Sequence, residues 1–469
     1  MTQIKYSPLR NQEIHTKPKP SIFSTSKICG FFSCILVAGC VCVSIALAKL
    51  TTENKFLQSP YTNYTSSYSF GVVSDFHLDL SLEKCCQFET DYSCICCPNN
   101  PTLLNATFHS FVKVLRMYVN TKFIFYLGNI ASKPNQTIQT YSYFSDFIRG
   151  SAVNIPVYPT LGINDRTLEN SKLFYAELYP SWIDLINCFG CPLAADDESV
   201  KDTITTGGYY AISTSYGAKI ISINTNLFLK NATFEEKAEG EGQIAWLERV
   251  LLASTADTSK SKMLIGGTAP GYSTKQIWRK KSGSTEPTRG EWDPYFLKKF
   301  TSLLSTHQFR WSGIFMGGVE FELVRLLDKQ YMFLTPPCSP RLCSDPVFRV
   351  AFLSQRDLEL LDLHQYYSPI EFFTRVGKAP KYMFDYSYER VIFGSQQPRG
   401  PVYLNTYSIS QFYLSLIESF NLPRWETLSF TKKIDKDDGF GSPLVTYCTT
   451  QNSNITLQLE CLKKYKFEF

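Results

Sequence analysis

The sequence predicts an α/β fold, and two observations support this prediction. Short apolar runs, the pattern of buried strands, alternate with longer segments whose apolar residues recur at helical spacing. Apolar residues make up 44% of the chain and aromatic residues 15%, which is enough to fill a large core. Strands that alternate with helices place their functional loops at the carboxyl ends of the strands. We therefore expect a layered α/β domain with its site at those strand ends.

Each expected element follows from one of these two patterns. Strands are predicted at the short apolar runs 70–73, 123–127, 155–161, 219–224, 263–265, 314–316 and 331–334. Helices are predicted at 104–119, 243–252 and 295–304. A later amphipathic helix is predicted by Ile409, Phe412, Tyr413, Leu416, Ile417 and Phe420, which share one helical face. We therefore divide the folded part into a main domain at 69–375 and a C-terminal helical extension at 376–469.

An uncharged apolar run at residues 28–48 precedes the domain. At about 1.5 Å per residue, it is long enough to cross the roughly 30 Å hydrocarbon layer of a bilayer. The basic tail at 1–27 lies before it, and the positive-inside rule places such a tail in the cytosol. We predict a transmembrane signal anchor, a polar stalk at 49–68, and a type II topology with the domain facing the extracellular space or a lumen. A cleaved signal peptide is the alternative, although its apolar core is usually only about 7–15 residues long.

The charge balance argues against one class of partner. The net charge of the chain is +5, and the basic tail carries +4 of it, from five Lys or Arg residues against Glu13. About +1 remains for the rest, which is too little for a nucleic-acid-binding face. The expected partners are the membrane, through residues 28–48, and a ligand or protein that the sequence does not identify.

Sequons and cysteines agree with the predicted side of the membrane. Five Asn-x-Thr sequons follow the apolar run and are candidate glycosylation sites: Asn63, Asn105, Asn135, Asn231 and Asn454. Eleven of the 15 cysteines also follow it, and clustered cysteines in an oxidising compartment indicate disulfides. The candidate disulfide cysteines are Cys188, Cys191, Cys338, Cys343, Cys448 and Cys461. Because eleven is odd, at least one thiol is free or bonded between chains. A zinc site at Cys94-Ile95-Cys96-Cys97 is the alternative, but it lacks the paired Cys-x2-Cys spacing.

A chemical motif follows the first predicted strand, where Asp75 and His77 form an Asp-x-His pair typical of metal ligands. From about residue 70 onward, the chain resembles the acid sphingomyelinase-like branch of the calcineurin-type metallophosphoesterases. The other matching segments occur in the family's order: Gly207-Gly208-Tyr209-Tyr210, Ile220 to Asn226, Gln243 to Leu247 and Asp345 to Val350. The resemblance implies a metallophosphoesterase-type four-layer α/β sandwich, here with a C-terminal helical extension and preceded by one transmembrane helix.

The resemblance also implies two divalent metals, held by histidines, an asparagine and carboxylates from five loops, which activate a hydroxide nucleophile. Most of those ligands are replaced here. Asn129 stands where the family has its bridging aspartate, and an amide cannot offset the repulsion between two cations. The other replacements are Ile163 for the asparagine ligand, Gly266-Gly267-Thr268 without the expected histidine, and Gly318 and Glu320 in the last loop. Asn164 stands where a histidine contacts substrate and is the candidate catalytic residue.

Two functions follow. In the first, the chain is a pseudoenzyme that binds a ligand or partner through the old cleft, with no metal or one residual divalent cation held by Asp75, His77, Asn129 and Glu320. In a related variant, Asp75 and His77 persist only as structural hydrogen-bonding groups. In the second function, the chain is an active phosphodiesterase with two zinc-type metals that cleaves a phospholipid headgroup or a nucleotide phosphoester. His109 and His307 are expected to be packing or surface residues, not ligands.

Overall fold

The computed structural model describes parts of the chain between residues 66 and 464, all within the unit Leu57–Phe469. The described residues are 66–82, 99–118, 120–151, 154–166, 171–187, 198–253, 261–271, 291–306, 311–318, 324–327, 330–339, 345–369, 382–388, 404, 409, 448 and 455–464. No helix within these ranges is long and apolar enough to cross a membrane. Predictions outside them stay untested: the tail, anchor and most of the stalk, nearly all of the helix at 409–420, and Asn63, Cys188, Cys191, His307, Glu320, Cys343 and Asn454.

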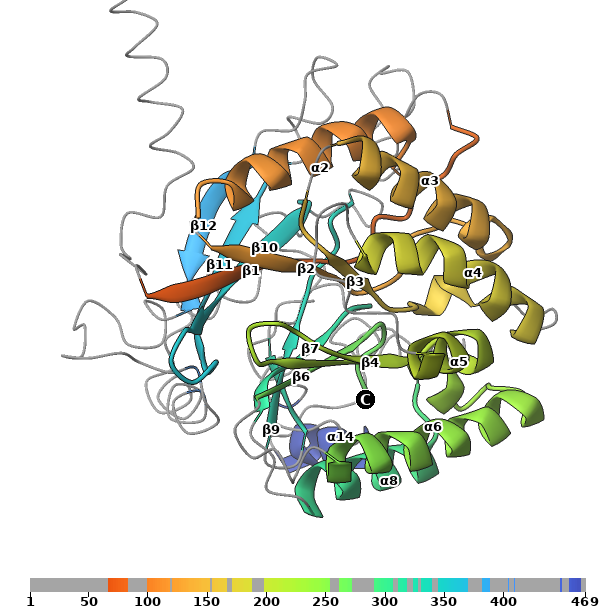
Figure 1. The fold of residues 1–469 in the computed structure, drawn as a ribbon. Coiled ribbons are helices and arrows are strands. Elements are labelled where there is room, and N and C mark those ends of the chain that lie inside the picture. The colour runs from red at the N-terminus through yellow and green to blue at the C-terminus, as the bar shows by residue number, and fades with distance from the viewer. Residues whose placement is uncertain are drawn as a thin grey trace, which may run out of the picture. The chain divides into compact units, whose positions relative to one another are not determined.

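The first sheet mixes parallel and antiparallel strands (Figure 1). Its strands are β1 (Ser67–Val73), β2 (Thr121–Tyr126), β3 (Val157–Pro159), β10 (Val347–Ser354), β11 (Leu360–Tyr367) and β12 (Met383–Ser387). Their order is β12-β11-β10-β1-β2-β3. Strands β1, β2 and β3 run parallel to one another. Strand β10 pairs antiparallel with β1, β11 with β10, and β12 with β11. The carboxyl ends of β1, β2 and β3 therefore share one edge of this sheet.

The second sheet has a parallel centre with an antiparallel strand at each edge. Its strands are β4 (Tyr210–Ser213), β5 (Lys219–Ile223), β6 (Lys262–Gly266), β7 (Trp311–Met316), β8 (Val324–Leu327) and β9 (Gln330–Leu334). Their order is β4-β5-β6-β7-β9-β8, with β5, β6, β7 and β9 parallel to one another. The loops that follow β5, β6 and β7 therefore also leave from one edge.

Helices cover the outer face of each sheet (Figure 1). The α-helices are α2 (Pro101–Leu115), α3 (Thr137–Gly150), α4 (Ser171–Ile186), α5 (Glu198–Gly207), α6 (Phe234–Ala253), α8 (Pro294–Thr306) and α14 (Ile455–Lys464). Short 3-10 helices are η2 (Pro134–Gln136), η3 (Ile163–Asp165) and η4 (Thr225–Phe228). The start of α2 shows why the sequence folds this way: the Asn100 side chain accepts a hydrogen bond from Leu103 N at 2.8 Å, and Pro101 occupies the first turn.

The two sheets pack face to face through aromatic side chains. The Phe315 ring of β7 lies 5.5 Å from Phe70 of β1 and 5.6 Å from Phe125 of β2. Its neighbours Ile314 and Met316 point the other way and join the buried cluster that contains helix α8. On the far side of the first sheet, the Phe111 ring of α2 lies 4.8 Å from Phe348 of β10. The order of layers is therefore helices, sheet, sheet, helices.

The observed elements confirm every expected strand and the helices at 104–119, 243–252 and 295–304, with shifted ends. Strands β4, β8, β10, β11 and β12 and helices α3, α4 and α5 lie outside the predicted elements. Strand β12 lies within the predicted helical extension at 376–469 and pairs with β11 in the first sheet, whereas α14 in the same range is a helix, as expected. Strand β1 begins within the predicted stalk, so that the stalk ends before Ser67.

The described cysteines give one confirmation and one correction. Cys448 and Cys461 form a disulfide with a Cα–Cα distance of 5.6 Å, which ties α14 to the preceding chain. Cys338, expected in a disulfide, is instead a free and fully buried thiol. Its Sγ lies 3.6 Å from the Tyr382 hydroxyl, and burial raises the pKa of the thiol to about 12. Cys338 is therefore an unreactive packing group of the core.

Candidate functional site

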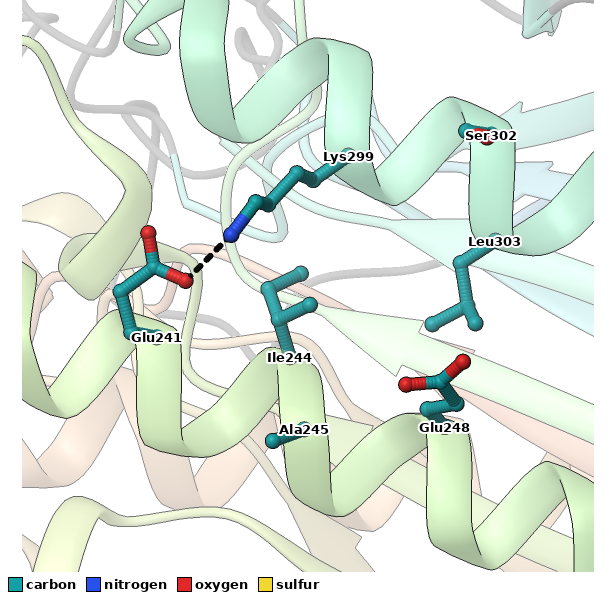
Figure 2. A pocket seen from close by; sticks show the side chains of 7 residues that line it. All are labelled: Glu241, Ile244, Ala245, Glu248, Lys299, Ser302 and Leu303. Atoms are coloured by element: carbon teal, nitrogen blue, oxygen red, sulfur yellow. Dashed lines mark hydrogen bonds and ion pairs between the residues drawn. The ribbon is translucent and has the colours of Figure 1, made fainter.

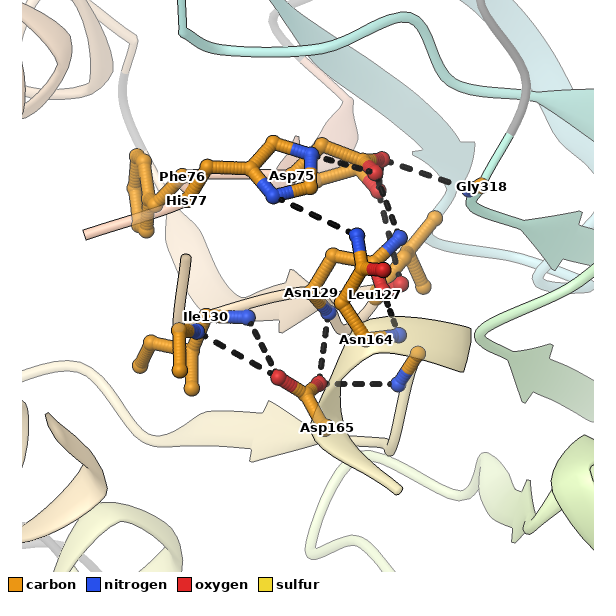
Figure 3. A network of polar contacts seen from close by, with 12 residues as sticks. Asp75, Phe76, His77, Leu127, Asn129, Ile130, Asn164, Asp165 and Gly318 are labelled. Atoms are coloured by element: carbon orange, nitrogen blue, oxygen red, sulfur yellow. Dashed lines mark hydrogen bonds and ion pairs between the residues drawn. The ribbon is translucent and has the colours of Figure 1, made fainter. Parts of the chain in front are cut away.

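The predicted site residues meet at the carboxyl ends of β1, β2 and β3 (Figure 3). The loop after β1 is bonded to the loop after β2 through Asp75 N to Gly128 O at 2.9 Å and His77 N to Asn129 O at 3.0 Å. The loop after β3 turns into η3, which carries Asn164. Asp75, His77, Asn129 and Asn164, four residues predicted from three motifs, therefore lie together.

Close backbone contacts bring loops of the second sheet to the same place. A Cβ atom at Gly317, just after β7, would lie 2.3 Å from the Leu127 carbonyl oxygen and 2.5 Å from Ser74 Oγ. A Cβ atom at Gly267, just after β6, would lie 2.0 Å from the Leu161 carbonyl oxygen. Both contacts require glycine, because a backbone oxygen cannot move aside cheaply. The glycines of the family motifs therefore retain a packing role here.

Asp75 is the centre of the polar network and is only 4% exposed. Its Oδ1 accepts a hydrogen bond from Asn129 Nδ2 at 2.5 Å. Its Oδ2 accepts one from Ser74 Oγ and one from Gly318 N, the latter at 3.2 Å. The single carboxylate is thus met by three donors from three loops, one of which belongs to the second sheet.

Asn129 links two loops of the first sheet. Its Nδ2 donates to Asp75, while its Oδ1 accepts a hydrogen bond from the backbone N–H of Asn164 at 2.8 Å. The residue is buried and has a φ of +57°, in the left-handed region that asparagine tolerates better than most residues. Both polar atoms of the amide are therefore in use.

His77 lies against the same network. Its Nε2 is 3.5 Å from Asp75 Oδ1, and its Nδ1 is 3.5 Å from Asn164 Nδ2. Asp75 and His77 also have positive φ angles, +57° and +47°. Strained backbone of this kind persists only where the surroundings hold it in place, and it is common at functional sites.

Asp165 is an important residue to which the sequence analysis assigned no role. It is fully buried and accepts hydrogen bonds from four backbone N–H groups. These belong to Asn129 at 2.6 Å, Ile130 at 2.9 Å, Ala131 at 3.3 Å and Gly162 at 2.9 Å. Burial raises the pKa of Asp165 to about 7, although these four hydrogen bonds act in the opposite direction. The signal in the sequence was an acidic residue directly after Asn164, in the run Gly162-Ile163-Asn164-Asp165.

The metal-binding residue types on the described loops are hydrogen-bonded to one another and to the backbone. Asp75 and His77 lie beside each other, and Asn129 presents its N–H group to Asp75. The second carboxylate of the network, Asp165, accepts from four backbone N–H groups. Within the part of the chain that the structure describes, no group of three or more His, Cys, Asp or Glu side chains could hold a metal ion. Thr268, in the loop that lacks its histidine, has a buried hydroxyl with no hydrogen-bond partner among the described residues.

The remaining described histidines lie outside this network. His109 is exposed on α2, and its ring contacts Phe147 with centroids 6.0 Å apart. His364 is fully buried in β11, with Nε2 at 2.9 Å from Asp362 Oδ2 and Nδ1 at 3.0 Å from the Tyr118 hydroxyl. His109 is thus a surface residue, as expected.

A separate pocket lies between α6 and α8 (Figure 2). It is lined by Glu241, Ile244, Ala245, Glu248, Lys299, Ser302 and Leu303. Glu241 and Lys299 form an ion pair of 2.6 Å at one end, and this partly exposed pair is of the kind that contributes little to stability. None of the loop residues at the strand ends line this pocket, so the two features are distinct.

Three of the candidate glycosylation sites lie in described parts of the chain. Asn105 on α2, Asn135 in η2 and Asn231 after η4 all have exposed side chains. The threonines of the first two sequons, Thr107 and Thr137, are fully buried, whereas Thr233 of the third is exposed. All three asparagine side chains therefore lie on the surface, and only the sequon of Asn231, among these three, has its threonine there as well.

Comparisons with known proteins agree with the motifs. No family model matches the chain. The chain is 26% identical over 152 residues to the sphingomyelinase phosphodiesterase C of Dictyostelium discoideum, a match that covers 32% of each protein. It is 26% identical over 239 residues to the cyclic GMP-AMP phosphodiesterase of Bos taurus, covering 46% of this chain and 47% of that one. The matched regions thus span about a third of the first of these curated relatives and about half of the second.

Two solved structures resemble this chain only weakly. A candidate 5'-nucleotidase of Staphylococcus aureus gives a TM-score of 0.37 at 12% identity, covering 74% of this chain and 58% of that one. The NAD nucleotidase of Haemophilus influenzae gives 0.31 at 10% identity, covering 85% and 60%. The sequence matches confirm the resemblance inferred from the motifs: the chain is weakly homologous to the acid sphingomyelinase-like phosphodiesterases.

Proposed function

We propose that this protein is a pseudoenzyme, a binding protein built on a metallophosphoesterase-type fold whose hydrolytic centre is lost. The observation that supports this most directly is the environment of Asp75. Its carboxylate, which a metal would need, is met by Ser74, Asn129 and Gly318. The ligand or partner would bind at the old cleft, near the strand ends that carry these loops.

The proposed location is a type II membrane protein, anchored through residues 28–48, with the domain in the extracellular space or an endomembrane lumen. The surface positions of Asn105, Asn135 and Asn231 support this side, because glycans need exposed acceptors. Expression of the full chain in a secretory host should give a protein whose electrophoretic mobility increases after enzymatic deglycosylation. Asn231→Gln should reduce that change by one glycan, and Asn154→Gln, at an exposed asparagine outside any sequon, is the control.

The alternative is an active phosphodiesterase that acts on a phospholipid headgroup or a nucleotide phosphoester. The observation in its favour is that Asp75, His77, Asn129 and Asn164 lie together at the strand ends, and that the relatives are named as phosphodiesterases. With Glu320, these residues would have to hold two zinc-type metals. The metals would supply a hydroxide nucleophile and polarise the phosphoryl oxygens.

One preparation separates the two proposals. The purified full chain is analysed for bound metal and assayed with a generic phosphodiester in the presence of Zn²⁺, Mn²⁺ or Ca²⁺. The pseudoenzyme predicts no turnover above a protein-free blank and at most one metal per chain. Two metals per chain, together with turnover that His77→Ala abolishes, would overturn the pseudoenzyme. The matched control is His109→Ala, because His109 is exposed and distant from the site in the described contacts.

A further inference from the structure

We infer that the Asn129 side chain has taken over the structural role of a metal and holds the site together without a cation. We call the hydrogen-bonded chain Asp75–Asn129–Asn164 the amide clasp. This inference rests on the proposed function, because it concerns the same loops, but it makes a separate claim. It says that an amide at position 129 is required for the folded site to exist free of metal.

The first step is the polarity of the two hydrogen bonds. Asn129 donates from Nδ2 to the Asp75 carboxylate and accepts at Oδ1 from Asn164 N. The opposite amide orientation would place oxygen against carboxylate and N–H against N–H, so the network determines the assignment. An amide offers both a donor and an acceptor, whereas a carboxylate offers acceptors alone. An aspartate at 129 could keep the bond to Asn164 but would lose the bond to Asp75.

The second step is charge. Asp75 and Asn129 are 4% and 2% exposed, and the joined atoms are 2.5 Å apart. Two carboxylates at this separation, away from water, repel strongly unless a cation lies between them. A divalent cation is what the family's bridging aspartate binds. Asparagine at 129 removes both the repulsion and the need for the cation.

The third step is what the clasp connects. Asp75 follows β1, Asn129 follows β2, and Asn164 follows β3, while Gly318 N of the second sheet donates to Asp75 at 3.2 Å. The clasp thus joins three loops of one sheet and contacts a loop of the other. Metal ions perform this joining in metalloproteins whose stability depends on the ion. Here hydrogen bonds supply the same connections.

The test is thermal unfolding of the full chain, followed by tryptophan fluorescence after dialysis against EDTA, with Mg²⁺, Mn²⁺ or Zn²⁺ then added. Asn129→Asp should lower the melting temperature by on the order of 5 °C or more in EDTA. A cation that binds between the two carboxylates of this variant should raise its melting temperature again, and the increase should grow with the cation concentration. The wild type and Asn129→Ala, which loses the amide without gaining charge, should show no such response.

A reversed clasp is the most informative control. The variant combines Asp75→Asn with Asn129→Asp. The new amide nitrogen at 75 occupies the position of Asp75 Oδ1 and can donate to the new carboxylate at 129. The oxygen of the same amide, in the place of Oδ2, can still accept from Ser74 Oγ and Gly318 N. The carboxylate at 129 can still accept from Asn164 N. This double variant should regain a melting temperature near that of the wild type and lose the response to cations.

Several outcomes would overturn the inference. One is a cation response in the wild type as large as in Asn129→Asp, and another is no response in Asn129→Asp. If Asn129→Asp does not fold, the reversed clasp decides: folding without metal supports the inference, and failure to fold overturns it. Phosphodiester turnover by the wild type would overturn the proposed function alone, because the clasp is judged by the melting data.

Discussion

The chain contains two buried Asp-x-His pairs, and their surroundings differ. Asp75 and His77 follow β1 in a loop with left-handed backbone, where Asp75 Oδ1 lies 3.5 Å from His77 Nε2. Asp362 and His364 lie within the regular strand β11, with 2.9 Å between Asp362 Oδ2 and His364 Nε2. The first pair is 4% exposed at each residue, and the second is fully buried.

The comparison shows that the motif alone does not define a metal site. We call Asp362 and His364 the strand pair. The Nδ1 atom of His364 lies 3.0 Å from the Tyr118 hydroxyl, which also contacts the Tyr366 hydroxyl. Burial raises the pKa of both tyrosines, so these hydroxyls remain neutral hydrogen-bonding groups. Aromatic rings surround His364, so this pair is part of the core. Asp75 and His77, which we call the loop pair, instead lie at the carboxyl ends of parallel strands, where loops from several strands meet.

The largest expected effect tests which pair matters more for stability. Asp362→Ala should lower the free energy of unfolding by about 3–5 kcal/mol, because it removes a fully buried carboxylate that lies 2.9 Å from His364 Nε2 and accepts from Leu363 N. Asp75→Ala should cost less, about 2–3 kcal/mol, because the donors it leaves lie at the edge of the sheets. Urea unfolding of the full chain measures both. An Asp75→Ala cost equal to or above that of Asp362→Ala would reverse the comparison.

The next effect concerns the support of the loop pair. Asp165→Ala should cost about 3 kcal/mol, because four buried backbone N–H groups lose their acceptor. Asp165→Asn should cost less, since its oxygen can still accept from Ile130 N and Ala131 N. Hydrogen exchange at Asn129, Ile130 and Ala131 should accelerate more in the alanine variant than in the asparagine variant. Equal exchange in both would show that Asp165 does not order this loop.

The fold was largely predictable because apolar periodicity reports burial directly. Strands such as β2, β5 and β7 are short apolar runs that are buried over most of their length. Strand β11 was missed because it places Asp362, His364 and Gln365 in the core, and these polar residues interrupt the apolar pattern. Strand β12 was missed because its pairing with β11 follows from tertiary contacts and not from its own sequence.

The candidate site was predictable only in part. The motifs correctly brought Asp75, His77, Asn129 and Asn164 together, because each follows a strand of one parallel set. The direction of the Asn129 amide could not be predicted, since it depends on which donors and acceptors the folded loops present. The role of Asp165 was hidden for a similar reason, because its four partners are backbone groups that carry no sequence signal.

A glycine substitution probes the contact between the sheets beside the loop pair. Gly317→Ala should cost about 2–3 kcal/mol, because its Cβ would lie 2.3 Å from the Leu127 carbonyl oxygen. Gly150→Ala, at the end of α3, is the matched control, since its Cβ would have no atom within 4 Å. The control should be neutral or stabilising by about 0.4–1 kcal/mol. Equal melting temperatures for the two variants would contradict the close approach.

The smallest effects come from removing a single hydroxyl next to each pair. Tyr118→Phe should cost about 1–2 kcal/mol, because His364 Nδ1 and the Tyr366 hydroxyl both lose a contact inside the core. Ser74→Ala should cost about 0.5–1 kcal/mol, because Asp75 keeps its bonds from Asn129 and Gly318. Urea unfolding at matched protein concentration resolves such differences when the slope with denaturant is unchanged. The free energy of unfolding could instead fall more in Ser74→Ala than in Tyr118→Phe. In that case, each hydrogen bond would matter more to the loop pair at the sheet edge than to the strand pair in the core.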